Sequence, residues 1–189
     1  MTLLKEFNLM ENKKLIFWLN LATIPLLLFF SVVFTFISNL FFGTNDIGST
    51  FNSDHLGASL FSFVLFFVVF FTLIVIHELI HGLFFKLFNR EGKVQFGFKN
   101  GMAYATSPNS YYPRSRFLII CLAPFILITT GLFVLLSFQF ISGFSFISYA
   151  SLHASACIGD FYWVFLLSSF KGEILVEDTE EGIRVYSKD

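Results

Sequence analysis

Four long apolar segments alternate with polar segments along this chain of 189 residues. The apolar segments cover residues 15–42, 58–88, 117–141 and 144–170. A helix that crosses a bilayer needs about 20 consecutive, mostly apolar residues, and each of these segments is long enough. The pattern therefore predicts four transmembrane helices.

Two of the polar segments have the alternation of apolar and polar residues that is typical of β-strands. In residues 93–106, an alternating stretch is followed by Lys99-Asn100-Gly101, a sequence that favours a tight turn. In residues 173–187, two such stretches flank the acidic residues 177–181, which we interpret as a solvated turn. Residues 43–57, which include His55, are rich in Gly, Ser, Asn and Asp and are expected to form a solvated loop.

The predicted fold class is therefore a mostly α membrane protein. It has four transmembrane helices, a β-hairpin after the second helix and a short β-hairpin at the C-terminus. We expect residues 1–189 to form a single membrane-embedded domain.

The composition agrees with a membrane protein and excludes an ordinary soluble domain. Hydrophobic residues make up 56% of the chain and charged residues 13%, with 30 Phe. A soluble domain has about 45–50% apolar and about 25% charged residues. The net charge of −1, without a long basic run, gives no reason to expect a nucleic-acid partner.

The distribution of Lys and Arg predicts how the chain is oriented. Six basic residues lie between Lys86, near the end of the second apolar segment, and the start of the third; three precede the first segment and three follow the fourth. The two remaining loops have none. Since loops rich in Lys and Arg stay in the cytoplasm, both termini and the 93–106 hairpin are expected on the cytoplasmic side.

The second apolar segment contains candidate metal-binding and catalytic residues in the sequence His77-Glu78-Leu79-Ile80-His81-Gly82. Two histidines four residues apart lie on one face of a helix and can bind one cation together. The glutamate beside the first of them can act as the general base toward a water molecule on that cation. Because an ionisable residue inside a membrane segment is costly, its presence indicates function.

A catalytic zinc site usually has three protein ligands, so a third ligand must come from elsewhere in the chain. With a rise of 1.5 Å per residue, His77 lies about 13 Å from Lys86 at the cytoplasmic end of its helix. Asp160 lies about 16 Å from Lys171 by the same measure, at a matching depth. We therefore predict Zn²⁺ ligands at His77, His81 and Asp160, with Glu78 as the catalytic residue.

Other residues of the membrane segments remain alternatives. His153 precedes Asp160 by seven residues, about 10 Å along a continuous helix, which is too far for a shared metal unless the helix breaks. It could contact substrate or move protons, or it could form a hydrogen bond with a neighbouring helix. Cys157 is an alternative thiolate ligand, whereas packing as a buried thiol is the simpler interpretation of both Cys157 and Cys121.

The motif from His77 to Gly82, the strands after it and the later Ile158-Gly159-Asp160 together resemble the site-2-protease-like intramembrane zinc metalloproteases. More closely, residues 58–189 are similar to the small bacterial membrane proteins classed as putative zincin peptidases. The resemblance implies that His77, His81 and Asp160 hold zinc and that Glu78 is the catalytic base. Site-2 proteases usually have Leu-Asp-Gly around the aspartate, whereas this chain has Gly-Asp-Phe, so the type of substrate stays open.

From these patterns we expect an integral membrane zinc metallopeptidase, in the plasma membrane of a bacterium, that cleaves an extended peptide or membrane protein within the lipid bilayer. The alternative is a non-enzymatic membrane subunit for transport or partner binding that a metal stabilises. A homo-oligomer is compatible with either function. The glutamate between the histidines favours the enzyme, because a structural zinc site does not need it.

Overall fold

The computed structural model describes residues 1–9, 11–43, 56–99 and 102–188. The expected loop with His55 lies outside these residues, as does the centre of the turn at Asn100-Gly101. Five helices and six strands form in the described residues: β1 (Thr2–Asn8), α1 (Lys13–Phe42), α2 (Leu56–Phe88), β2 (Gln95–Lys99), β3 (Met102–Thr106), β4 (Tyr112–Pro113), α3 (Arg114–Ser137), α4 (Gly143–Ala156), α5 (Ile158–Ser168), β5 (Ile174–Thr179) and β6 (Gly182–Ser187).

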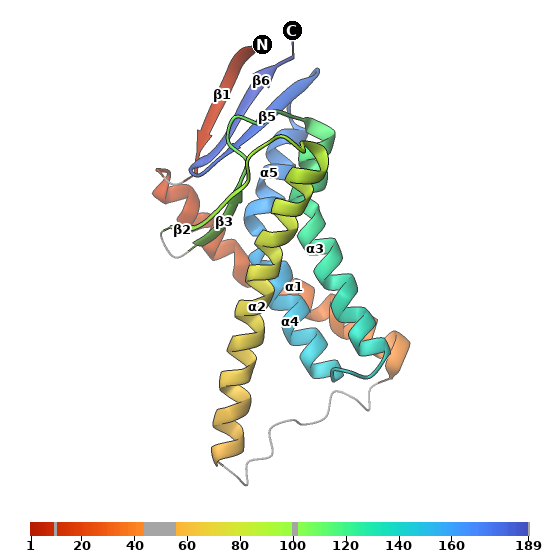
Figure 1. Cartoon of the computed structure of the whole chain (residues 1–189). Coiled ribbons are helices and arrows are strands. Elements are labelled where there is room, and N and C mark those ends of the chain that lie inside the picture. Colours follow the sequence, from red (N-terminus) through yellow and green to blue (C-terminus); the bar gives the residue numbers. More distant parts are fainter. Residues whose placement is uncertain (10, 44–55, 100–101, 189) are drawn as a thin grey trace.

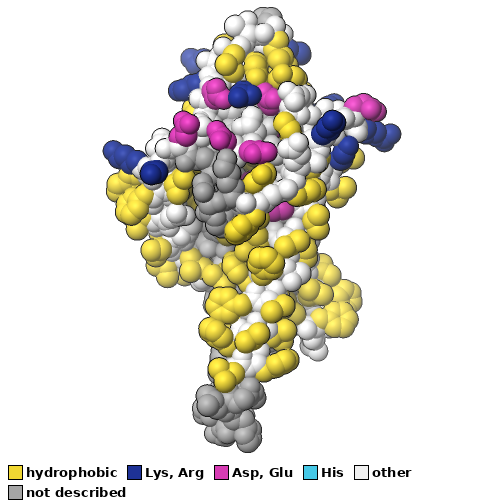
Figure 2. Space-filling model, turned by 60° about the vertical axis from the view of Figure 1, so that its left-hand side comes forward, with side chains coloured by type: hydrophobic (Ala, Val, Ile, Leu, Met, Phe, Trp, Pro, Cys, Tyr) yellow, Lys and Arg dark blue, Asp and Glu magenta, His cyan; other side chains and the backbone are white. Residues whose placement is uncertain are grey.

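The helices have the length and apolar surface of a membrane protein. In the described part of the chain, α1, α2 and α3 are each long and apolar enough to cross a bilayer. The bent pair α4 and α5 makes a fourth span if it is counted as one. Figure 2 shows hydrophobic side chains over the lower part of the molecule and charged side chains gathered toward the upper end.

The helices pack in pairs, with α1 along α4 and α2 along α3. Phe34 of α1, Leu73 of α2 and Phe146 of α4 meet in one buried cluster, into which α3 inserts Ile128 and Leu132. Figure 1 shows that the first half of α2 projects away from the other helices. The second half of α2, which carries the histidine motif, is therefore the half that the fold surrounds.

The sequence predicted one helix over residues 144–170, and this was wrong. The segment forms two helices, α4 and α5, that meet at Cys157 with a bend of 47°. Cys157 has φ −70° and ψ 12°, away from the ψ of about −42° of an α-helix. Side chains compete for carbonyl groups just before the bend: the Ser155 hydroxyl donates to Leu152 O and the Cys157 thiol to His153 O. Side chains that compete with backbone N–H groups for these carbonyls disturb the hydrogen bonds of the helix and can bend it.

The C-terminal hairpin formed as predicted, but it belongs to a larger sheet. The antiparallel order is β1-β6-β5-β4, so the first strand of the chain pairs with the last, Thr2 opposite Ser187. Both termini therefore lie at the same end of the molecule (Figure 1). Alternate residues of β5 and β6 point inward and form a core with Phe117 and Leu167, which comprises Ile174, Val176, Ile183 and Val185.

The hairpin of β2 and β3 also formed as predicted, with Gln95 opposite Thr106. It lies beside α2 at the level of the motif. Gly82 makes this approach possible, because a Cβ at that position would overlap the ring of Phe96 in β2. The last residue of the motif thus places a strand next to its histidines.

Candidate metal centre

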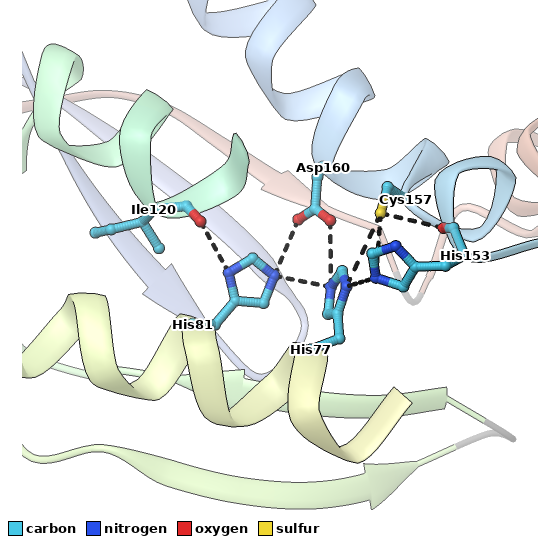
Figure 3. Close-up of polar contacts among 6 residues, drawn as sticks. All are labelled: His77, His81, Ile120, His153, Cys157 and Asp160. Carbon is cyan, nitrogen blue, oxygen red and sulfur yellow. Dashed lines mark hydrogen bonds and ion pairs between the residues drawn. The ribbon is translucent and has the colours of Figure 1, made fainter. Parts of the chain in front are cut away.

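The two motif histidines lie one helical turn apart on α2 and direct the same ring nitrogen at one point. Nε2 of His77 and Nε2 of His81 are 3.0 Å apart. Asp160, in the first turn of α5, completes the group from the other side (Figure 3). Its Oδ2 lies 3.3 Å from His77 Nε2 and its Oδ1 lies 3.3 Å from His81 Nε2.

This triangle of donor atoms fits a tetrahedral zinc ion. Ligands at about 2.0–2.1 Å from a tetrahedral Zn²⁺ are about 3.3 Å from one another. The separations of 3.0, 3.3 and 3.3 Å agree with that value, although each histidine faces a different oxygen of Asp160 and only one oxygen needs to bind the ion. Two ring nitrogens and a carboxylate oxygen that face each other this closely also repel, unless a proton or a cation lies between them. The donor set therefore suits one divalent metal with three protein ligands.

Outer contacts hold both imidazoles in place. Nδ1 of His81 lies 3.0 Å from the carbonyl oxygen of Ile120 in α3. A carbonyl only accepts, so His81 Nδ1 carries the proton and Nε2 is left to face the metal position. Nδ1 of His77 lies 3.1 Å from Nε2 of His153. The prediction that a hydrogen bond joins His153 to a neighbouring helix is thus confirmed. His153 contacts His77 on the side of the ring that faces away from Asp160.

Glu78 is half-buried, next to His77 on α2 and outside the donor triangle. Its carboxylate accepts a hydrogen bond from the backbone N–H of Ala105 in β3. The side chain therefore remains available for proton transfer beside the metal position, and it also connects the helix to the strand.

Both cysteines are free, buried thiols, as predicted from their apolar surroundings. Cys157 Sγ lies 3.9 Å from His77 Nδ1 and 3.9 Å from His153 Nε2. The thiol therefore lies on the Nδ1 side of His77, and the triangle lies on the Nε2 side. His77, His153 and Cys157 form a second group of close donors that shares one imidazole with the first.

The centre opens into a cavity of about 490 Å³. Its walls are mostly apolar and come from α1, α2, α3, β3, the bend between α4 and α5, and the turn between β5 and β6. Ala103, Tyr104 and Ala105 of β3 lie along one wall, with the motif residues beside them. A segment of chain that entered this cavity would pass between a strand and the candidate metal ligands.

The acidic residues 177–181 are more than a solvated turn. Glu177 is buried and accepts hydrogen bonds from the backbone N–H of Asn109 and the hydroxyl of Tyr186, both at 2.8 Å. Asp178 is half-buried and lines the cavity, where burial raises the pKa of its carboxyl from 3.8 to about 8. Strand periodicity could have identified it, because Asp178 follows Ile174 and Val176 on the same face of β5.

One of the comparisons with known proteins gave a match. A family model described as "Putative zincin peptidase" matches residues 70–175, which include the whole motif and Asp160. Neither the curated proteins nor the solved structures gave a match.

Proposed function

The chain belongs to the putative zincin peptidases, and we propose that it is a zinc metallopeptidase whose catalytic centre lies within its membrane helices. One observation carries this proposal: His77, His81 and Asp160 form a donor triangle of zinc dimensions with Glu78 beside it. Zincins as a group are zinc peptidases. A glutamate that touches a three-ligand centre without being part of it suits hydrolysis better than a structural site.

His77, His81 and Asp160 would hold the ion, and Glu78 would be the catalytic residue. Bound zinc supplies a Lewis acid that polarises the scissile carbonyl and acidifies water. Glu78 accepts a proton from the attacking water as the C–O bond forms. The same carboxyl then delivers the proton to the amine nitrogen as the C–N bond breaks, so that one side chain serves as base and then as acid.

The substrate is proposed to be an extended peptide or an unwound segment of a membrane protein. The N–H of Ala105 points toward Glu78 and thus away from β2. Backbone groups two residues apart in a strand point the same way, so those of Ala103 also face the cavity. Such an edge can bind an extended chain through main-chain hydrogen bonds. In this respect the proposed enzyme resembles the site-2-protease-like intramembrane proteases.

For the placement in the membrane, we propose four spans, with α4 and α5 together forming the last. The strands of one sheet must lie on the same side of the membrane. They precede α1, lie between α2 and α3, and follow α5, so the chain must cross the membrane an even number of times between them. The excess of Lys and Arg in these same segments supports a cytoplasmic location for the sheet and both termini. A bacterial plasma membrane fits this orientation. The 189 residues would then act as one embedded domain.

The test compares wild type with Glu78→Gln, purified in nanodiscs and loaded with zinc. Each is incubated with a proteome-derived peptide library, and new N-termini are identified by mass spectrometry. Glutamine keeps the size of the side chain and an oxygen that accepts from Ala105, but it cannot take the proton. We expect equal zinc content and a loss of cleavage of about 10²- to 10⁴-fold, the usual contribution of general acid–base catalysis.

Two outcomes would contradict the proposal. Cleavage by Glu78→Gln at the wild-type rate would contradict the assignment of Glu78 as the general base. Zinc bound without any cleavage by wild type, of the library or of co-expressed membrane proteins, would favour the non-enzymatic metal-stabilised subunit.

A further inference from the structure

His77 is held at both of its ring nitrogens by two helices that follow each other in the chain. Its Nε2 faces Asp160 of α5 at 3.3 Å, and its Nδ1 faces His153 of α4 at 3.1 Å (Figure 3). His153 is 2% exposed, so water does not compete for this contact. One imidazole therefore connects the last turn of α4 to the first turn of α5.

The double contact agrees with the spacing of the two residues along the chain. His153 precedes Asp160 by seven residues, about 10 Å at a rise of 1.5 Å per residue. The contact of 3.1 Å on one side of the His77 ring, the ring itself and the contact of 3.3 Å on the other side together span most of this distance. The imidazole of His77 therefore fits between the side chains of His153 and Asp160.

The contact with His153 has a chemical consequence for the ligand. A neutral imidazole carries one proton, and it binds metal through the other nitrogen. For His77 to present the lone pair of Nε2, its Nδ1 must keep the proton and donate it. His153 Nε2, at 3.1 Å, is placed to accept that proton. In this pairing His153 carries its own proton on Nδ1, and its Nε2 stabilises the form of His77 that can bind the ion.

The two ligands differ in the kind of outer partner. His81 donates to the backbone carbonyl of Ile120, which no side-chain substitution removes. His77 depends on a side chain, which can be replaced. The site therefore has one fixed histidine and one whose orientation depends on another residue.

We propose that His153 is a positioning residue that holds His77 in the tautomer and orientation in which Nε2 faces the metal position. This inference rests on the proposed metal centre. Partners of this kind typically change metal affinity by 10- to 100-fold when they are removed.

The experiment measures zinc affinity by competition with a fluorescent chelator, in full-length protein in nanodiscs. His153→Leu removes the acceptor, whereas His153→Gln retains an oxygen that can accept from Nδ1. Ser151→Ala is the control, because Ser151 is equally buried in α4 and is not among the residues that line the cavity. We expect His153→Leu to bind zinc 10- to 100-fold more weakly, with His153→Gln and Ser151→Ala within about threefold of wild type.

The outcomes separate this inference from the proposed function. Failure of wild type to bind zinc refutes the metal centre itself. Normal zinc binding by His153→Leu, or equal weakening by Leu and Gln, refutes the positioning role alone. Two zinc ions per wild-type chain would refute it as well, because His153 and Cys157 would then be ligands of a second ion. Should His153→Leu not fold, His153→Asn, whose shorter amide does not reach His77, replaces it against His153→Gln.

Discussion

Two carboxylates lie near His81, and the structure assigns them different roles. Asp160 faces both histidines, with one carboxylate oxygen 3.3 Å from His77 Nε2 and the other 3.3 Å from His81 Nε2. Asp178 lines the same cavity but lies outside this group of donors. Asp160→Asn and Asp178→Asn each replace a carboxyl group in the same cavity with an amide and keep the side-chain volume. Only the first should remove a ligand.

The size of the expected loss follows from the number of ligands. Structural zinc sites with four ligands bind with about 10–16 kcal/mol, or about 2.5–4 kcal/mol per ligand. At about 1.4 kcal/mol per factor of ten, the loss of Asp160 should weaken zinc binding by about two to three orders of magnitude. Asp178 is not among the donor atoms, so we expect Asp178→Asn to change zinc binding by less than about tenfold.

The assay is a chelator competition that gives the zinc dissociation constant of wild type and of each variant in nanodiscs. Circular dichroism of the metal-free proteins serves to show that both variants fold. The reasoning is refuted if Asp178→Asn loses as much affinity as Asp160→Asn. It is also refuted if Asp160→Asn binds zinc as tightly as wild type.

Two further predictions concern stability. Since the pKa of Asp178 is raised from 3.8 to about 8 by burial, the folded metal-free protein holds a proton that the unfolded chain releases between these values. Its stability should therefore fall as pH rises from about 4 to about 8. Asp178→Asn should reduce this slope in thermal unfolding midpoints, and an unchanged slope would contradict the assignment. Gly182→Ala should destabilise the protein by more than about 1 kcal/mol, because its Cβ would overlap the backbone oxygen of Phe7 at φ +154°. Gly159→Ala, where a Cβ meets nothing within 4 Å, should be neutral or stabilising in the same denaturation assay.

The sequence alone was sufficient wherever a local pattern determines structure. Apolar length identified the helices, and the four-residue spacing placed His77 and His81 on one face. Depth along two helices identified Asp160 as the acid that meets them, and the donor distances agree with that pairing. The two hairpins followed from strand alternation and turn residues.

The parts that could not be predicted depend on departures from regular geometry or on distant partners. The break between α4 and α5 at Cys157 was not predicted, because neither helix contains a proline that would mark it. Strand β1 was missed because its residues carry mixed charge and its partner, β6, lies at the other end of the chain. Asp178 was taken for part of a solvated turn because acidity was given more weight than the alternation of its strand.

The pairing of the first strand with the last has a consequence for biosynthesis. Strand β1 is synthesised before the helices, yet its partner β6 follows after roughly 170 further residues. At about 5–20 residues per second, β1 must wait about 10–35 s before that edge can form. The motif histidines likewise wait for Asp160, so both the sheet and the metal centre are completed only after α1, α2, α3 and α4 have been made. A nascent chain of this proposed peptidase would therefore remain without a competent centre while its helices enter the membrane.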